Sequence, residues 1–338
     1  MKKAPLSPER SPVLEVDGLE VDFETGDGRV RAVRGLSYRL GPGETLGVVG
    51  ESGSGKSVTH LAMLGLLPDT AEVRAERLRF QGNDLPPAGS EALRRLRGRG
   101  IGMIFQDPMT SLNPFLTLGT QIAEMARIHL GLRGAALRET VVAALAEVGI
   151  PNPELRIEQY PHEFSGGMRQ RAMIAMMLVA EPALLFADEP TTALDVTVQA
   201  QILGLLASLQ ERRGMSIVLI THDLGVVAGF AHRILVMYAG RVVEEAPTPA
   251  LFANPSHPYT RGLLRSIPRL DEEREELEPI PGQPPDLLAL PEGCPFAPRC
   301  PSVRELCLRE EPGLRSLEDG HALACHVDLE PFDHEERS

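Results

Sequence analysis

Gly50-Glu-Ser-Gly-Ser-Gly-Lys-Ser57 is the stretch of sequence that decides the fold, because its spacing matches G-x-x-x-x-G-K-[ST], the pattern of a phosphate-binding loop. An apolar run over 44–50 precedes it and is typical of a buried strand. The apolar spacing over 58–67 predicts a helix that ends before Pro68. Strand, loop and helix in this order are the context that the motif requires. The sequence therefore predicts a nucleotide site in an α/β fold.

The lysine of this loop stands out in a chain that otherwise uses arginine. Of the 34 basic residues only three are lysine, and the other two, Lys2 and Lys3, lie near the N-terminus. A compact ammonium makes a point-charge contact that a planar guanidinium cannot reproduce. We expect Lys56 to bind the β- and γ-phosphates, Ser57 to place its hydroxyl on Mg²⁺, and the helix N-terminus to add positive charge. The residues expected to bind nucleotide here are Gly50, Ser52, Gly53, Ser54, Gly55, Lys56, Ser57 and Val58.

Composition and charge limit the class of partner. The 338 residues can hold one large domain with an appendage or two domains, and 43% hydrophobic content is ample for a core. A formal net charge of −13 argues against nucleic acid as the main partner. No run of 18 apolar residues and no apolar signal-peptide region are found. We therefore expect a soluble cytoplasmic chain that reaches a membrane through a partner.

Other strands end in side chains suited to phosphate chemistry. One apolar run ends in Asp188 and Glu189, and ligands bind at the carboxyl ends of strands in a doubly wound sheet. We expect Asp188 to hold Mg²⁺ and Glu189 to polarise the attacking water. Another run delivers His222, whose imidazole is expected to hydrogen-bond the γ-phosphate. Gln106 follows a further strand-like run, and its amide is expected to bridge the metal or the water.

A second glycine-rich helix start lies upstream of the acidic pair. Glu163-Phe-Ser-Gly-Gly-Met-Arg-Gln170 precedes a predicted helix over 168–180, so Ser165, Gly166 and Gly167 form another anion-binding helix start. One nucleotide does not need two phosphate cradles in one subunit. We therefore expect a dimer in which each chain's cradle closes over the ATP of its partner.

These motifs resemble those of ABC-transporter ATPases. The string around Ser165 is similar to their signature sequence, with Phe164 for the usual Leu and Met168 for the usual Gln, and Ala193-Leu-Asp195 resembles their D-loop. The resemblance implies a P-loop NTPase core of ABC type with an antiparallel β subdomain and a helical subdomain. It also implies that Phe23 stacks on adenine. The residues that it assigns to the partner's ATP are Ser165, Gly166, Gly167 and Met168, and it places Asp195 in the D-loop.

The domain limits expected from the resemblance are an N-terminal tail over 1–12, an ABC ATPase domain over 13–245 with its helical subdomain at about 107–160, and a C-terminal extension over 246–338. A helix over 135–149 fits the helical subdomain, because Leu137, Val141, Leu145 and Val148 share one face.

Two strings are similar to the ATPases of oligopeptide and dipeptide permeases. They are Gln106-Asp-Pro-Met-Thr-Ser-Leu-Asn-Pro114 and Phe164-Ser-Gly-Gly-Met-Arg-Gln-Arg171. The Met-Arg-Gln-Arg form of the second string, together with Thr191-Thr-Ala-Leu-Asp-Val-Thr-Val-Gln199, resembles the D-type subunit. The resemblance implies an ATPase that powers a peptide importer from the cytoplasmic face of the inner membrane. The implied partners are a homologous F-type ATPase in a heterodimer, two transmembrane permeases and an extracytoplasmic substrate-binding protein.

The C-terminal extension concentrates the cysteines. All four, Cys294, Cys300, Cys307 and Cys325, fall in the last 45 residues. An acidic run over 271–278 precedes them, and the first two lie within a proline-rich connector over 279–301. Disulfides are rare in the cytosol, and the spacing matches neither a zinc ribbon nor a ferredoxin run, so zinc, a cluster and free thiols stay open. The strings 293–300 and 324–326 resemble the tail of the peptide-permease ATPases, which binds a four-iron four-sulfur cluster in some members. This resemblance favours a cluster that acts as a structural staple.

Two other functions remain compatible with these motifs. One is a soluble ABC ATPase of DNA repair or translation, although such proteins typically carry long coiled-coil insertions or two cassettes. The other is an iron–sulfur protein that uses ATP to act on a partner outside transport. A GTPase is disfavoured, because no Asn-Lys-x-Asp string is present.

Overall fold

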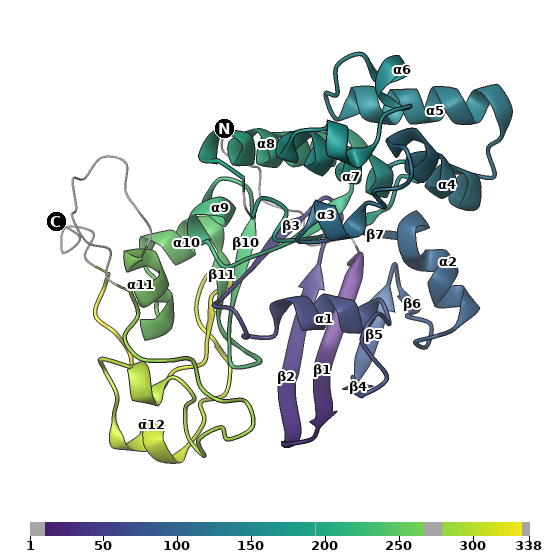
Figure 1. Ribbon diagram of the computed structural model, residues 1–338. Helices are drawn as coiled ribbons and strands as arrows, with labels where there is room; N and C mark the ends of the chain where they lie inside the picture. Colours follow the sequence, from purple (N-terminus) through teal and green to yellow (C-terminus); the bar gives the residue numbers. More distant parts are fainter. Residues whose placement is uncertain (1–10, 193, 267–278, 333–338) are drawn as a thin grey trace. The chain divides into compact units, whose positions relative to one another are not determined.

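The computed structural model describes residues 11–192, 194–266 and 279–332 (Figure 1). The chain divides into two units, the first built from 1–40, 45–85 and 219–338 and the second from 41–44 and 86–218. The N-terminal residues 1–10, Ala193 of the expected D-loop and the acidic run over 271–278 lie outside the described residues. Each unit is described in turn.

An antiparallel sheet forms one part of the first unit. Strand β1 pairs with β2 from Leu14 opposite Leu40 to Thr25 opposite Gly28, and β1 also pairs with β4 and β5. The register of β1 shifts between Val16 and Leu19, which flank Gly18 at φ 62°, so that the buried positions change parity along the strand. The strands are β1 (Leu14–Thr25), β2 (Gly28–Leu40), β4 (Ala71–Arg74), β5 (Arg77–Phe80) and β6 (Asn83–Asp84).

The phosphate-binding loop lies between β3 (Thr45–Val49) and α1 (Lys56–Met63), as the sequence predicts. All five residues of β3 are buried, and β3 pairs in parallel with β10 (Arg233–Tyr238). Helix α1 packs on β1 and β2 (Figure 1). It is shorter than the expected helix over 58–67, because Gly65 takes φ 59° and the N–H of Leu66 bonds back to the carbonyl of Leu61. This glycine cap ends the helix before Pro68 is reached.

The C-terminal part of the first unit adds short elements to β11 (Arg241–Pro247), which pairs with β10 and with β13 (Ala322–Leu323). The connector over 279–301 is irregular except for one 3₁₀ turn, as its prolines predict. The remaining elements are α9 (Leu224–Ala228), α10 (Thr248–Ala253), α11 (Pro258–Arg265), η2 (Ala297–Arg299), α12 (Glu305–Arg309) and β12 (Arg315–Ser316).

The second unit combines two parallel strands with helices. Strand β7 (Ile101–Ile104) pairs with β8 (Leu184–Asp188), and α7 (Gly166–Leu178) contacts β7, α4, α5 and α8. The helix expected over 168–180 therefore begins two residues earlier, at Gly166. The other elements are α2 (Glu91–Arg99), α3 (Pro108–Ser111), α4 (Leu118–Leu130), α5 (Gly134–Glu147), α6 (Pro153–Arg156), η1 (Pro161–Glu163) and α8 (Val196–Arg213). Strand β9 (Ser216–Thr221) begins in this unit and ends in the first.

The helix expected over 135–149 is present as α5, and its apolar face is buried. Leu137, Val141, Leu145 and Val148 are each less than a tenth exposed, and α5 packs against α4 and α7 (Figure 1). None of the helices in the described ranges is long and apolar enough to cross a membrane.

Candidate functional site

Lys56 is buried in the phosphate-binding loop, and carbonyl oxygens of the loop accept hydrogen bonds from it. Its Nζ donates to the carbonyl oxygens of Gly50 at 2.6 Å and Glu51 at 2.8 Å. No side chain caps the N-terminus of α1, where Gly55 at φ 95° is the N-cap residue. The ammonium and the N-terminal N–H groups of α1 therefore belong to the same turn of chain, which is the arrangement that an anionic phosphate requires.

Two glycines of the loop are required by close contacts with backbone. A Cβ on Gly50 would lie 2.2 Å from the carbonyl oxygen of Met237, and a Cβ on Gly55 would lie 2.4 Å from that of Ala32. Both neighbours are backbone atoms of strands or their ends and cannot move aside cheaply. The sequence pattern of the motif thus has a packing cause as well as a phosphate-binding one.

Residues of the C-terminal segment also form hydrogen bonds with the loop, and the sequence did not predict these contacts. The guanidinium of Arg299 donates to both carboxylate oxygens of Glu51, at 2.6 and 2.9 Å, and the N–H of Glu51 donates to the Tyr259 hydroxyl at 2.7 Å. These partners lie 248 and 208 positions from Glu51 in sequence. No local pattern could have found these contacts, although Glu51 lies within the phosphate-binding motif and Arg299 within the cysteine-containing string over 293–300.

Two more predicted residues belong to the first unit. His222 directly follows β9 and has an exposed side chain, as expected for a group that meets a ligand. Phe23 lies in β1 opposite Val30 and Ala71 and is half-buried, unlike the fully buried Val21 beside it. A half-buried ring leaves a face available for stacking, and its contact with adenine stays a prediction.

The second unit brings three predicted residues together at the end of β8. Asp188 is the last residue of the strand and is 7% exposed, and Glu189 follows it with φ 45°, a left-handed conformation that is uncommon for glutamate. Gln106 donates from Nε2 to Glu189 Oε2 at 2.8 Å, and the Thr192 hydroxyl donates to the same oxygen at 2.9 Å. The contact of Gln106 with Glu189 was not foreseen, because the sequence linked the amide only to the metal or water.

The expected signature lies at the N-terminus of α7, also in the second unit. Ser165 is the N-cap residue, and its Oγ accepts from the Met168 N–H at 3.4 Å. Ser165 and Gly166 are exposed, whereas a Cβ on Gly167 would lie 2.8 Å from Val198 Cγ1 of α8. The exposed helix start can accept an anion, and Gly167 is explained by helix packing.

Asp195 of the expected D-loop caps the next helix. Its Oδ1 accepts from the Val198 N–H at 2.9 Å, at the N-terminus of α8, and its side chain is exposed. The neighbouring Val196 is 80% exposed. A cap of this kind fixes the direction in which the loop leaves the helix.

The four cysteines line one small cavity, together with His257 and His326. All four thiols are free, and Cys307 is packed with Ala297 and Val327 while Cys294 and Cys325 border the same apolar cluster. Burial raises the pKa of Cys294 to about 11 and raises the pKa values of Cys300 and Cys325. Among the described residues, no three His, Cys, Asp or Glu side chains form a group that could hold a metal ion. The thiols therefore share a cavity without converging on one ion position.

Comparison with known proteins decides the family. Residues 33–192 match the family described as ABC transporter, and residues 243–307 match the oligopeptide/dipeptide transporter, C-terminal region. The dipeptide transport ATP-binding protein DppD of Bacillus subtilis is 51% identical over 95% of this chain and 96% of its own length. The chain belongs to the family of ABC-transporter ATP-binding proteins. The predicted family is thus confirmed, and the chain is an ABC-type ATPase.

Other ABC proteins agree with this assignment. The oligopeptide transport ATP-binding protein OppD of Salmonella typhimurium is 50% identical over 94% of each chain. Among solved structures, cbiO1 of Clostridium perfringens, part of the ABC transporter complex cbiONQ, has a TM-score of 0.62 and 28% identity over 72% of this chain and 92% of its own. The cassette MJ0796, solved as a dimer bound to ADP and Pi, has a TM-score of 0.61 and 26% identity, over 70% of this chain and 98% of its own. The predicted ABC-type P-loop fold is confirmed.

Proposed function

We propose that this chain hydrolyses ATP to power an importer of dipeptides or oligopeptides. The observation that supports this most is the presence in one chain of an ABC transporter match over 33–192 and a peptide-transporter C-terminal match over 243–307. The similar DppD and OppD proteins are named as dipeptide and oligopeptide transport proteins, and neither name favours a soluble ABC ATPase of another process. On this basis the ABC domain spans 13–245 and the extension 246–338.

We assign nucleotide binding to the residues that the sequence motifs single out. Lys56 contacts the β- and γ-phosphates, and Phe23 stacks on adenine. Ser57, Gln106 and Asp188 hold Mg²⁺, which neutralises charge on the transferred phosphoryl group. The other loop residues that bind nucleotide are Gly50, Ser52, Gly53, Ser54, Gly55 and Val58.

Hydrolysis is assigned to Glu189 and His222. The Glu189 carboxylate accepts hydrogen bonds from Gln106 and Thr192, which fix its direction, and it orients the attacking water. His222 hydrogen-bonds the γ-phosphate in the transition state. The signature residues Ser165, Gly166, Gly167 and Met168, with Asp195 of the D-loop, act on the ATP of the partner ATPase. Closure of the dimer then drives the permeases from one facing to the other.

The proposed partners are an F-type ATPase homologue, two permeases at the membrane and a substrate-binding protein. We propose that three exposed apolar side chains in the helical segment contact a partner protein. Phe115 is 86% exposed, Ile128 65% and Leu155 73%. We assign this segment, 107–160, to the permease contact at the cytoplasmic face of the membrane.

The test is an affinity pull-down of the tagged chain from detergent-solubilised native membranes, followed by mass spectrometry. Two polytopic permeases and a second, homologous ATPase are expected. If the only ATPase recovered is a second copy of this chain, the proposed heterodimer with an F-type subunit is wrong. A set of soluble partners with no membrane protein would overturn the importer.

We further propose that Cys294, Cys300, Cys307 and Cys325 hold a four-iron four-sulfur cluster that staples the extension. In such a cluster each thiolate binds a different iron, so its ligands lie farther apart than those of one zinc ion. The backbone N–H of Val327 donates to Cys325 Sγ at 3.3 Å, a kind of bond that also occurs to the sulfurs of iron–sulfur clusters. Iron and acid-labile sulfide analysis of anaerobically purified protein tests the proposal, and zinc without sulfide would replace it with the alternative.

A further inference from the structure

The phosphate-binding loop is held at Glu51 from three directions. Tyr259 accepts from its N–H, Lys56 donates to its carbonyl oxygen, and Arg299 binds its carboxylate with two hydrogen bonds. Two of these three partners come from the C-terminal extension. The N–H and the side chain of Glu51 are therefore held by contacts from the C-terminal extension, and its carbonyl oxygen by the loop's own lysine.

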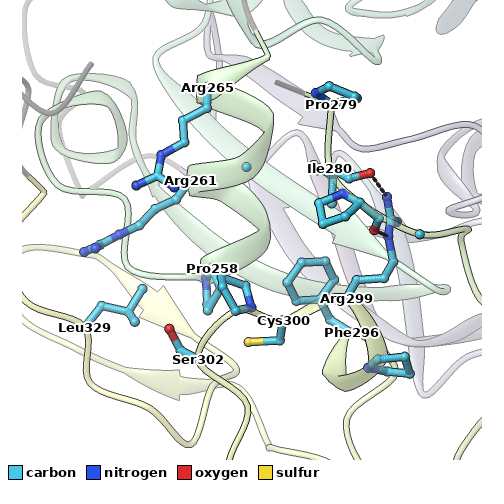
Figure 2. A pocket seen from close by; sticks show the side chains of 15 residues that line it. Pro258, Arg261, Arg265, Pro279, Ile280, Phe296, Arg299, Cys300, Ser302 and Leu329 are labelled. Atoms are coloured by element: carbon cyan, nitrogen blue, oxygen red, sulfur yellow. Dashed lines mark hydrogen bonds between the residues drawn. The ribbon is translucent and has the colours of Figure 1, made fainter. Parts of the chain in front are cut away.

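Arg299 is itself rigidly placed. Its side chain is 3% exposed, and besides Glu51 it donates from Nε to the carbonyl oxygen of Pro281 at 2.9 Å and from Nη2 to that of Ile280 at 3.3 Å (Figure 2). The rings of Tyr238 and Phe296 lie under its guanidinium, with centroids at 5.8 and 5.9 Å. A planar guanidinium held by these contacts loses little freedom when it binds a carboxylate, so the pair is preorganised.

Figure 2 shows the cavity, of about 500 Å³, whose wall includes Arg299, Phe296 and Cys300. Arg299 directly precedes Cys300, so the arginine that binds Glu51 belongs to the same short turn as one of the cysteines. The extension thus reaches the nucleotide loop through a side chain anchored in its own cysteine-bearing segment.

The ion pair of Arg299 and Glu51 affects ATP binding through the charge of the Glu51 carboxylate. Glu51 is the second residue of a loop that receives a polyphosphate, and an uncompensated carboxylate there would repel it. Arg299 neutralises that carboxylate, and the two parallel hydrogen bonds hold it in a fixed direction.

We propose that Arg299 is a positioning residue for ATP binding, which acts by neutralising and holding Glu51 of the phosphate-binding loop. This inference rests on the proposed function only in that the loop binds ATP. The C-terminal extension then contributes to the affinity for ATP, in addition to any role in transport specificity or in binding a cluster.

The test measures the Kd of Mg·ATP on the full chain by equilibrium dialysis for Arg299→Gln and for the double variant Glu51→Gln, Arg299→Gln. Arg299→Gln leaves the carboxylate uncompensated and is expected to weaken binding roughly tenfold. The double variant removes the repelling charge too and is expected to return to within about threefold of wild type. This rescue shows that the effect of Arg299 on ATP passes through the Glu51 carboxylate, because a defect independent of that carboxylate would persist in the double variant.

Arg304→Gln is the matched control, because Arg304 is exposed in the same segment and carries the same charge. It is expected to bind ATP as wild type does. If Arg299→Gln binds ATP as wild type, or if the double variant is as weak as Arg299→Gln, the proposal is wrong. A wild-type chain that binds no ATP would instead overturn the proposed function.

Arg299→Lys covers the case in which Arg299→Gln does not fold. It keeps the positive charge in the buried position but cannot make two parallel hydrogen bonds to a carboxylate. A weakening of ATP binding by about threefold is expected from this lost geometry. Binding by Arg299→Lys equal to that of wild type would overturn the proposal.

Discussion

Glu189 carries the conformation that most directly points to chemistry. Its φ of 45° is sparsely populated for glutamate, and the strain is maintained where Gln106 and Thr192 both bond to its carboxylate. We expect Glu189→Gln to bind ATP normally and to lose turnover by roughly 10²–10⁴-fold, because the amide cannot act as a base toward water. Phosphate release and ATP binding, measured on the same preparation, check both parts.

The control for this prediction is Glu211→Gln, which removes a carboxylate from the exposed side of α8. Its turnover should equal that of wild type. Equal turnover in Glu189→Gln and wild type would exclude Glu189 as the group that activates water.

The site residues that could be predicted from the sequence are those that belong to a short motif. Lys56 begins the helix that follows the strand and loop of its motif, and Asp188 and Glu189 lie at the end of a short apolar strand, so these places could be predicted. Arg299 and Tyr259 could not, because their partner Glu51 lies more than 200 positions away and contact at that separation leaves no periodic signal.

Helix α7 depends on a close approach to α8 at Gly167. A Cβ there would lie 2.8 Å from Val198 Cγ1, so Gly167→Ala must push the two helices apart or force an off-rotamer valine. We expect Gly167→Ala to lower the free energy of unfolding by about 1–3 kcal/mol. Urea denaturation followed by circular dichroism measures it.

Gly204 on α8 is the matched comparison for Gly167→Ala. Gly204 has nothing within 4 Å of a built Cβ, so Gly204→Ala is expected to raise stability by about 0.5–1 kcal/mol. Combining Gly167→Ala with Val198→Ala should recover most of the loss. If Gly167→Ala is as stable as wild type, the packing explanation of this signature glycine fails.

The elements themselves were predicted to within a few residues, and the errors have local causes. Helix α1 ends at Met63 because the glycine cap at Gly65 satisfies its last carbonyls, whereas the prediction relied on Pro68. Helix α7 starts at Gly166 because Ser165 caps it, a signal that was present in the sequence.

Across the whole molecule, the motifs alone predicted an α/β fold with a nucleotide site, and their resemblance to those of ABC-transporter ATPases predicted the ABC fold. The cysteines were also foreseen as one group, and all four line one cavity. What the order could not supply is the chemistry in that cavity. The intervals between the cysteines do not define a ligand geometry when irregular chain connects them.

Two buried histidines make the stability of the molecule depend on pH. His60 in α1 and His257 before α11 are 0% and 1% exposed, and burial lowers the pKa of each to about 4. Above the ordinary value of 6.5 both are neutral in the folded and unfolded chain. Between pH 6.5 and about 4 the unfolded chain binds protons that the folded chain does not, so stability falls as the pH falls.

His257→Asn isolates one of these contributions. The Nδ1 atom of His257 accepts from the Tyr259 N–H at 3.0 Å, and an asparagine oxygen can accept the same bond at this helix start without titrating. We expect the variant to lose roughly 2 kcal/mol less stability than wild type between pH 7.5 and pH 5. Urea unfolding at both pH values measures this, with His162→Asn, an exposed position, as the control. An equal loss in His257→Asn and wild type would mean that His257 is already protonated in the folded protein at pH 5.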